Sequence, residues 1–526
     1  MQPSPGGSPD PAPDPPIPED DPDTRPERET RGQLRGSGLL LIGRLLSVGV
    51  NLVTQILIVR YLPRSDYGAF AYALSLVTLI GGLLGLGFDR AISRFLPMYD
   101  EQSDHAKFLG TLVLVFGVII GLGATVSLVV IGLQGALIGQ FVDDPQAVRI
   151  VVFMVALAPI EALDGVLTDF FAVFRSARTI FVRKYILAPG LRLAVVSLLI
   201  LSGSDVDFLA AGYVLAGAVG ILLYGTLLPG MLRQARILEH LRGGRIRIPL
   251  REIASYTVPL LTIDLVLLSM SSLDALLVGN IHGTDEVAAL RVVESTARLN
   301  SLVFTTFSIL FVPAAARFFA RDDRISMRDL YWRTAAWMAV LSFPVFALTF
   351  SLAEPLTITL FGERYASSGT ILALLSLGRY IDSAFGANGT TIRIFGGIRE
   401  IVIVNVVTAV GHLALALLLI PPLGALGAAL AILLTYMGYN LLKQYVLQRV
   451  TGMPMFERAY LSTYAAIVLA AGAIAVLEIV IDPPFVIALV VAGIGSLAVL
   501  AFGRRHLRLA ETFPELLRFP GGRFLR

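Results

Sequence analysis

Charged side chains inside long apolar runs are the residues of this chain best placed to do chemistry. A charge in a membrane helix is costly unless it faces a cavity or a partner, so such residues mark transport pathways or ion relays. We predict that arginines line a central cleft and neutralise an anionic head group, because their fork of donors matches phosphate oxygens. The cationic candidates for substrate binding are Arg44, Arg192, Arg298 and Arg379. The candidates for counter-ions, or for carrying a coupling ion, are Glu161, Asp164, Asp264, Asp274, Glu294, Asp382 and His412.

The same residues allow a second interpretation. Arg44 with Asp264 would be a structural ion pair that holds the helices together. Arg379 with Asp382, three residues away on one helix, would be another. His412 would either carry a coupling proton or lie buried as a neutral histidine bonded to a neighbour. The coupling ion would be H+ or Na+.

The composition indicates that membrane helices position these charges. Of 526 residues, 55% are hydrophobic and only 15% are charged, whereas soluble domains carry roughly 25% charged residues. Apolar runs of about 20 residues, the length of a helix that crosses a bilayer, predict an all-α integral membrane protein with about fourteen transmembrane helices. The predicted spans are residues 37–59, 68–88, 108–133, 149–171, 185–201, 208–229, 256–279, 287–315, 335–352, 367–386, 401–420, 423–442, 461–480 and 485–502.

The distribution of Arg and Lys between these spans predicts the orientation of the chain. Cationic connections tend to stay on the cytoplasmic side, and most cationic residues fall in even-numbered connections. The odd-numbered connections hold only Arg60, Arg64, Arg149, Arg291, Arg298 and Arg364. Both termini are therefore predicted to be cytoplasmic, in a multi-pass protein of the cell membrane.

A repeat divides the chain into two similar parts. Residues 57–71 align without a gap with residues 276–290, at an offset of 219 that places Asp285 over Asp66. Six predicted spans separate the copies, so both enter the membrane from the same side as parallel repeats. The predicted organisation is a disordered cytoplasmic tail at 1–35, six-helix lobes at 36–230 and 253–448 joined by a basic cytoplasmic connection at 231–252, two additional helices at 459–503 and a basic interfacial tail at 504–526.

Motifs of enzyme active sites are missing from the sequence. It contains no GxxxxGKS or GxxxxGKT phosphate loop, no HExxH metal motif, no GxSxG elbow and no cysteine. We therefore predict no catalytic residue, no metal site, no cofactor and no nucleic-acid partner. The protein is predicted to be a transporter rather than an enzyme.

Several features together resemble one family. They are the stretch GLLLIGRLLSVGVNLVTQILIVRYLPRSDYGAFAYALSLV, its echo with Asp274 before LLVGN, the basic connection between six-span lobes and the two extra spans. Over residues 36–505 this pattern resembles the polysaccharide flippases of the multidrug/oligosaccharidyl-lipid/polysaccharide exporter superfamily. The resemblance implies a V-shaped, two-lobe transporter that moves polyprenyl-pyrophosphate-linked glycans to the outer leaflet by alternating access. It also implies a cationic cleft for the pyrophosphate, with lipid-linked glycan, membrane lipid and glycan-assembly enzymes as partners of a monomer.

Two other functions stay open. An ion-coupled multidrug exporter of the same superfamily would need an acidic and aromatic cleft for its cations, whereas the predicted cleft mixes arginine with acid. A membrane glycan polymerase or glycosyltransferase would usually show a large outer loop with clustered polar residues. The odd-numbered connections are all short, which disfavours the polymerase.

Overall fold

The computed structural model of the chain describes residues 25–85, 87–133, 144–173, 181–234, 246–257 and 272–507. Within these ranges every regular element is a helix, so the predicted all-α class is confirmed. The predicted coupling residue Asp264 lies outside the described residues, as do residues 508–526 of the predicted C-terminal tail.

The first half begins with a long helix. α1 starts at Arg25, inside the predicted N-terminal tail, because Pro26 suits the first turn of a helix and the Glu and Arg residues that follow favour helix. The first-half helices are α1 Arg25–Tyr61, α2 Arg64–Gly85, α3 Phe88–Glu101, α4 His105–Gly132, α6 Pro145–Met154, α7 Leu157–Val173, the π-helix η1 Phe181–Leu187, α9 Ala188–Ser202 and α10 Val206–Gln234.

The second half is followed by two extra helices. Its helices are α13 Asp274–His282, α14 Thr284–Arg298, the 3-10 helix η3 Leu299–Ser301, α15 Leu302–Ala320, α16 Arg324–Phe346, the π-helix η4 Ala347–Ser351, α17 Ala353–Phe361, the 3-10 helix η5 Glu363–Tyr365, α18 Ser368–Ala384, α19 Asn388–Ile394 and α20 Ile398–Thr451. The extra helices are α21 Arg458–Ile481 and α22 Phe485–Leu507. The 54 residues of α20 are interrupted by the φ of +57° and ψ of −132° at Gly424, just after Pro421 and Pro422. This break separates two helices, at the point where the sequence predicts that one span ends and the next begins.

The number of membrane spans is lower than predicted in the part of the chain that the structure describes. Nine helices there are long and apolar enough to cross a membrane, or eleven if each of two bent helix pairs is one span. One reason is that residues 258–271, in the predicted seventh span, are not described. Another is that α20 counts once, although the break at Gly424 divides it into two helices. In addition, α18 has only 17 residues, at the lower limit for a helix that crosses a bilayer. The protein is a multi-pass membrane protein, and the count of fourteen stays a prediction.

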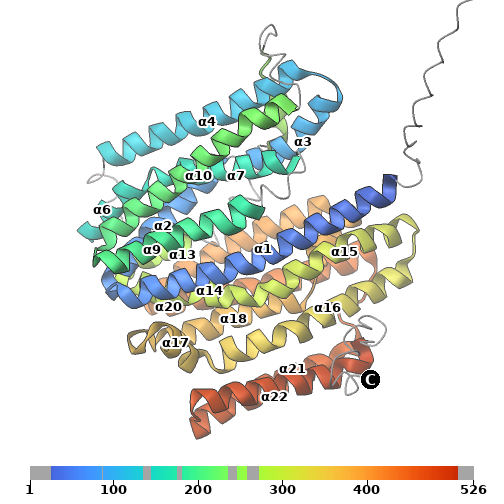
Figure 1. Cartoon of the computed structure of the whole chain (residues 1–526). Helices are drawn as coiled ribbons and strands as arrows, with labels where there is room; N and C mark the ends of the chain where they lie inside the picture. The colour runs from blue at the N-terminus through green and yellow to red at the C-terminus, as the bar shows by residue number, and fades with distance from the viewer. Residues whose placement is uncertain are drawn as a thin grey trace, which may run out of the picture.

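The two halves pack against each other through their repeated helices. Figure 1 shows most of the first half (blue to green) above the second half (yellow to orange), with α1 between them and α21 and α22 (red) at the bottom, against α16. α2 packs on α7 in the first half, α14 packs on α18 in the second, and α2 packs on α14 between the halves. Buried residues of α2, such as Ala69 and Ala73, and of α14, such as Ala288 and Val292, share one hydrophobic core. The helices that carry the repeat therefore meet at the centre of the molecule.

Residues 246–257, which precede α13 in the chain, are attached to the first half. The backbone N–H of Arg247 donates to the carbonyl of Ala106 at 3.2 Å. The Glu252 carboxylate accepts hydrogen bonds from the Tyr99 hydroxyl at 2.7 Å and from Lys107 Nζ at 2.8 Å. These hydrogen bonds lower the pKa of Glu252, that from Lys107 most. The chain thus enters the second half from a point fixed on α3 and α4.

Candidate functional site

A cavity of about 580 Å³ lies between the two halves. Its walls are formed by α1, α2, α9 and α10 of the first half and by Ser272 and α14 of the second. α1 contributes Val48, Leu52, Gln55 and Ile58, a spacing of three to four residues that puts their side chains on one face of a helix. Arg44 is exposed and lies one turn before Val48 on the same face, but it does not line the cavity.

Arg192 is the cationic residue of the first half that faces the cavity. It is carried by α9, and its guanidinium lies 3.7 Å from the carboxylate of Glu161 on α7. The guanidinium carbon also lies 5.6 Å from the ring centre of Tyr213. The predicted residues Arg192 and Glu161 therefore form a pair, and the side chain of Arg192 remains 42% exposed.

Three charged residues on one face of α14 form the corresponding group in the second half. Arg291, Glu294 and Arg298 all line the cavity, as expected for residues three and four positions apart on a helix. Arg298 Nη2 donates to Glu294 Oε1 at 2.5 Å, and Arg291 Nη1 donates to the other carboxylate oxygen, Oε2. The side chain of Glu294 is only 16% exposed, whereas that of Arg298 is 53% exposed. One carboxylate is therefore shared by two arginines, and Arg298 is open to a ligand.

Gln55 closes the inner wall of the cavity by joining the halves. Its side-chain amide, on α1, donates to the backbone carbonyls of Arg291 at 3.1 Å and of Val292 at 2.9 Å on α14. Such bonds cross from one half to the other in the middle of the molecule. They also fix the height of α14, and with it the position of the charged group, against α1.

A second, much smaller cavity of about 30 Å³ lies behind Glu294. Its lining includes Asp274, Arg291, Glu294, Arg379 and Tyr436, so it shares Arg291 and Glu294 with the main cavity. The guanidinium carbon of Arg379 lies 5.4 Å from the ring centre of Tyr436. The rest of the lining is apolar, but these polar side chains and the volume suit about one water molecule. The predicted residues Arg379 and Asp274 are thus separated from the main cavity by the α14 group.

Asp274 and His412 form a buried pair beside this small cavity. His412 Nε2 lies 3.1 Å from Asp274 Oδ1, with 2% and 4% of the side chains exposed. The other ring nitrogen, Nδ1, lies 2.9 Å from the hydroxyl of Thr435. The two residues come from α13 and α20, and the proximity of an acid and a histidine makes this pair able to share a proton.

Asp382 has a different partner from the one considered in the sequence. Its carboxylate accepts from Lys443 Nζ at 3.2 Å and from Asn440 Nδ2 at 3.0 Å. Arg379 and Asp382 therefore do not form the ion pair that their spacing allows. Lys443 also lies 3.8 Å from the ring centre of Tyr439, so Asp382 belongs to a polar cluster between α18 and α20.

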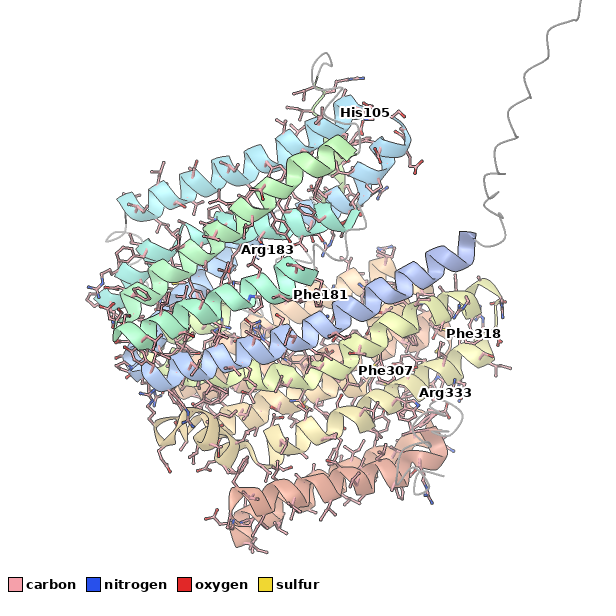
Figure 2. The ribbon with its side chains drawn as sticks, viewed as in Figure 1. His105, Phe181, Arg183, Phe307, Phe318 and Arg333 are labelled. Carbon is pink, nitrogen blue, oxygen red and sulfur yellow. The ribbon has the colours of Figure 1, made fainter. Side chains whose placement is uncertain are left out.

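Asp164 pairs with Arg183 inside the first half. Arg183 Nη2 donates to Asp164 Oδ1 at 2.5 Å, and Arg183 Nε donates to the carbonyl of Gly220 at 3.2 Å. The guanidinium carbon lies 4.9 Å from the ring centre of Tyr224. Figure 2 marks Arg183 among the first-half helices, where only 6% of the residue is exposed. Asp164 is therefore part of a structural pair that ties η1 to α7 and α10.

We call the end of the molecule formed by residues 59–66, 282–286 and 359–365 the closed end. Arg60 Nε of the first half donates to the carbonyl of Leu360 at 2.8 Å. Arg364 of the second half donates in return to the carbonyl of Val59. Arg64 Nε donates to the carbonyl of Asp285 at 3.2 Å, and its guanidinium lies 3.7 Å from the carboxylate of Glu286. Arginines from both halves thus bind the backbone of the opposite half.

Close backbone packing completes the closed end. A Cβ atom on Gly68 would lie 2.1 Å from the carbonyl oxygen of Thr284, so only glycine allows α2 and α14 to approach this closely. The hydroxyl of Thr284 donates to Asp144 at 2.8 Å. At the break in α20, His282 Nε2 lies 2.9 Å from the Ile420 carbonyl, and Glu286 accepts from the N–H of Ala425 at 3.2 Å. These contacts satisfy backbone groups that the break leaves without helical partners.

Comparison with known proteins assigns the chain to a family. The family described as polysaccharide biosynthesis protein matches residues 33–319. The chain belongs to this family. No curated protein sequence matches the chain significantly.

Solved structures share the fold. The lipid II flippase MurJ in an inward closed conformation has a TM-score of 0.69 at 14% identity, over 89% of this chain and 98% of that one. A multidrug resistance MATE family transporter of the MOP superfamily in an inward-facing conformation has a TM-score of 0.56 at 15% identity, over 78% and 98%. A mutant of the Vibrio cholerae MATE transporter VcmN has a TM-score of 0.54 at 16% identity, over 80% and 96%. The predicted polysaccharide family is confirmed by the family match, and these structures, of a flippase and of transporters, show that the fold is shared.

Arg291 and Gln55 are two of the cavity residues that were not among the predicted site residues. Arg291 appears in the sequence only as a cation in an odd-numbered connection, and Gln55 only as the polar position that the repeat aligns with Asp274. Each residue therefore differs from the general pattern of the sequence around it. A positive charge on the side of the membrane that otherwise lacks charge needs a local partner, and Arg291 has one in Glu294. Within the described residues, no group of acids and histidines is arranged to hold a metal ion.

Proposed function

We propose that the protein moves a polyprenyl-(pyro)phosphate-linked oligosaccharide from the inner to the outer leaflet by alternating access, for the assembly of surface polysaccharide or another glycan. One observation carries the proposal: among the described residues, three arginines and one carboxylate line the cavity between the halves. A cationic cavity suits a phosphate-bearing head group. The family, described as polysaccharide biosynthesis protein, and the shared fold of a lipid II flippase support a lipid-linked sugar as the cargo.

The proposed orientation puts the closed end on the outer side of the membrane and both termini in the cytoplasm, as the positive charges of the connections predict. In this state the head group enters from the cytoplasmic side, past Arg44, while its polyprenyl tail stays in lipid. The lobes at 36–230 and 253–448 then rock about their contact, so that the cytoplasmic side closes and the closed end opens. The protein acts as a monomer, beside glycan-assembly enzymes.

The predicted site residues take different roles in this proposal. Arg192 and Arg298, together with Arg291, bind the phosphates, and Glu161 and Glu294 are their counter-ions. Arg379 lies in the small cavity on the far side of Glu294, so its charge affects the head group through Glu294. Asp164 and Asp382, each held by a basic residue, stabilise their own halves.

Coupling to an ion is proposed for the Asp274–His412 pair. An acid and an imidazole in contact favour H+ over Na+, because Na+ is a hard cation that prefers oxygen ligands. We expect Asp274→Asn to remove the response of transport to an imposed pH gradient, while the binding of substrate persists. A response of transport to a Na+ gradient alone would contradict H+ as the coupling ion. The measurement is initial transport rate in vesicles with each gradient imposed separately.

Reconstituted vesicles test the proposed function directly. A fluorescent polyprenyl-pyrophosphate disaccharide on the inner leaflet becomes accessible to an external quencher only after it has crossed. We expect Arg298→Gln to slow this crossing at least roughly tenfold, because one cationic partner of the phosphates is lost. Arg149→Gln is the matched control, since Arg149 is 57% exposed and also paired, with Asp207 at 3.2 Å, but lies away from the cavity. Equal crossing in both variants, or none in the wild type, would overturn the proposal.

A multidrug exporter is disfavoured by the same cavity. Its cationic substrates would meet three arginines and one carboxylate, and like charges in a poorly hydrated site repel strongly. The same vesicles therefore should not accumulate a lipophilic cationic dye. Dye transport without glycan transport would favour the exporter.

A further inference from the structure

We infer that Glu294 takes up one proton when a pyrophosphate head group binds, so that proton binding and substrate binding are linked at this residue. The inference rests on the proposed function and specifies how its site recognises the head group. It begins from the shared carboxylate: Arg291 holds one oxygen of Glu294, and Arg298 holds the other. Both oxygens of Glu294 are therefore occupied by the guanidinium groups that a phosphate would need.

A bound phosphate competes with Glu294 for these two arginines. Arginine forms its strongest bonds as two parallel N–H donors to phosphate or carboxylate oxygens, and a pyrophosphate offers more oxygens and more charge than one carboxylate. Arg298, at 53% exposed, can turn toward a ligand, whereas Glu294, at 16% exposed, stays behind. Loading of the site would then take Arg298 away from a nearly buried carboxylate. Arg291, at 15% exposed, would stay beside Glu294, but the phosphates would compensate part of its charge. A carboxylate left in this way is costly while ionised and takes up a proton instead.

The net charge of the site loaded with a pyrophosphate is zero only if Glu294 is protonated. With Glu294 ionised, the group of Arg291, Arg298 and Glu294 carries one net positive charge. A pyrophosphate diester carries two negative charges, so the loaded site would have one net negative charge if Glu294 stayed ionised and none once Glu294 is protonated. A phosphate diester, with one negative charge, gives a neutral site with Glu294 ionised. The site therefore distinguishes the two head groups by whether a proton is needed.

The other charged groups around Glu294 balance one another. Arg192 pairs with Glu161 across the cavity. On the far side of Glu294, Arg379 and Asp274 line the same small cavity, together with the hydroxyl-bearing Tyr436. His412, in contact with Asp274, is the remaining titratable group of this cluster. The small cavity joins Glu294 to the Asp274–His412 pair, and so provides a path of about one water molecule for the proton.

Counting the protons taken up on binding tests the inference. The probes are a short-chain prenyl-pyrophosphate N-acetylglucosamine and the matching prenyl-phosphate N-acetylglucosamine, two diesters that do not titrate near neutral pH. Calorimetry of the purified full-length protein at pH 7.5, in buffers of different ionisation enthalpy, gives the number of protons bound. We expect about one proton with the pyrophosphate and about none with the phosphate. By linkage, affinity for the pyrophosphate should rise up to roughly tenfold for each pH unit that the pH falls.

Variants locate the proton. Glu294→Gln should bind the pyrophosphate probe at least as tightly as the wild type but without proton uptake. The matched variant Glu457→Gln should still take up the proton, since Glu457 is also paired with an arginine, Arg328, and is 19% exposed, but does not line the cavity. Uptake that persists in Glu294→Gln and vanishes in Asp274→Asn would overturn the inference by placing the proton on Asp274. Should Glu294→Gln fail to fold, the wild type decides, since equal pH dependence for the two probes also overturns the inference. Binding of neither probe would overturn the proposed function itself.

Discussion

Arginines lie at the boundary between the halves both at the closed end and in the cavity, but they bind different groups in the two places. At the closed end, Arg60 and Arg364 donate to backbone carbonyls of the opposite half. In the cavity, Arg291 and Arg298 pair with a carboxylate of their own helix, Glu294. A carbonyl cannot take up a proton near neutral pH, and it cannot leave its helix. A carboxylate can be neutralised by a proton and replaced as a partner by a phosphate.

This difference separates the residues that hold a conformation from those that exchange partners. In the proposed transport cycle, bonds between the halves stabilise the closed state and break when that end opens. Bonds within one half survive such a movement, so the α14 group can stay intact whichever side of the membrane it faces. Gln55 lines the cavity and also bonds between the halves, because its side-chain amide on α1 donates to two backbone carbonyls of α14.

Substituting one arginine in the cavity and one at the closed end should give the largest difference in affinity for the pyrophosphate probe. Arg291→Gln should weaken binding of the pyrophosphate probe by about 2–5 kcal/mol, or at least roughly 30-fold, since it removes a charged partner of the phosphates and leaves Glu294 less compensated. Arg60→Gln should leave this binding within about threefold, because its hydrogen bonds are to the backbone of the closed end. Calorimetric titration of both purified variants makes the comparison. Equal losses of affinity would mean that the two regions do not differ in function.

Much of the fold follows from hydropathy, charge and repeat. Apolar runs, the bias of Arg and Lys and the alignment of Asp66 with Asp285 depend only on the order of residues along the chain. They led to a two-part, all-α membrane protein of the correct family. The placement of Arg192 and Arg298 in the cavity could also be anticipated, since a buried cation must face a polar space. For both residues, burial of the apolar neighbours on the same helix determines which way the side chain points.

Pairing between distant helices could not be predicted in the same way. Asp382 contacts Lys443, 61 positions later in the chain, rather than the nearby Arg379. His412 meets Asp274, which lies in the second half's first described helix. Each of these pairs depends on the rotation of one helix against another, and periodicity within a single helix carries no information about it. Arg291 was missed because the sequence analysis counted it only among the cations of an odd-numbered connection, although it lies within the predicted span 287–315 beside its partner Glu294.

A methyl group at Gly68 should open the closed end. In Gly68→Ala the new Cβ would lie 2.1 Å from the carbonyl oxygen of Thr284, and a backbone atom cannot move aside as a side chain would. Overpacking of this kind costs about 1–3 kcal/mol, which would shift the balance between conformations roughly 5- to 150-fold. The chain has no cysteine, so a single Ala288→Cys substitution, at a buried position one turn from Thr284, reports opening by its rate of thiol labelling.

Gly49→Ala is the control for this substitution. A Cβ atom on Gly49, in the interior of α1, meets nothing within 4 Å, so labelling at the Ala288→Cys position should stay unchanged. If Gly68→Ala labels at the control rate and stays folded, α2 and α14 are free to slide without separating. The closed end would then owe its stability to the arginines alone, and substitution of Arg364 should raise labelling instead.

The opposite end of the molecule provides the smallest expected effect. There Glu252 joins residues 246–257 to α3 through a partly buried hydrogen bond from Tyr99 and to α4 through an exposed one from Lys107. The exposed bond contributes less than about 1 kcal/mol. Because the pKa of Glu252 is lowered in the folded protein, mainly by Lys107, this contribution is present above the ordinary carboxyl pKa of about 4.3 and is lost as the pH falls through the lowered value. Hydrogen exchange of residues 246–257 should therefore be nearly the same at pH 7 and pH 5 after correction for intrinsic rates, and faster only in stronger acid.

Glu252→Gln should reproduce the acid effect at pH 7, with exchange of residues 246–257 raised at most roughly fivefold. Glu101→Gln, an exposed carboxylate on the same helix as Tyr99, should leave it unchanged. A much larger change in Glu252→Gln, with loss of protection at the closed end as well, would show that the two ends are energetically coupled. The weak attachment that we expect at Glu252 instead fits an end that separates and rejoins in each proposed transport cycle. The arginine–carbonyl bonds of the closed end fit a state that persists while the cavity is loaded.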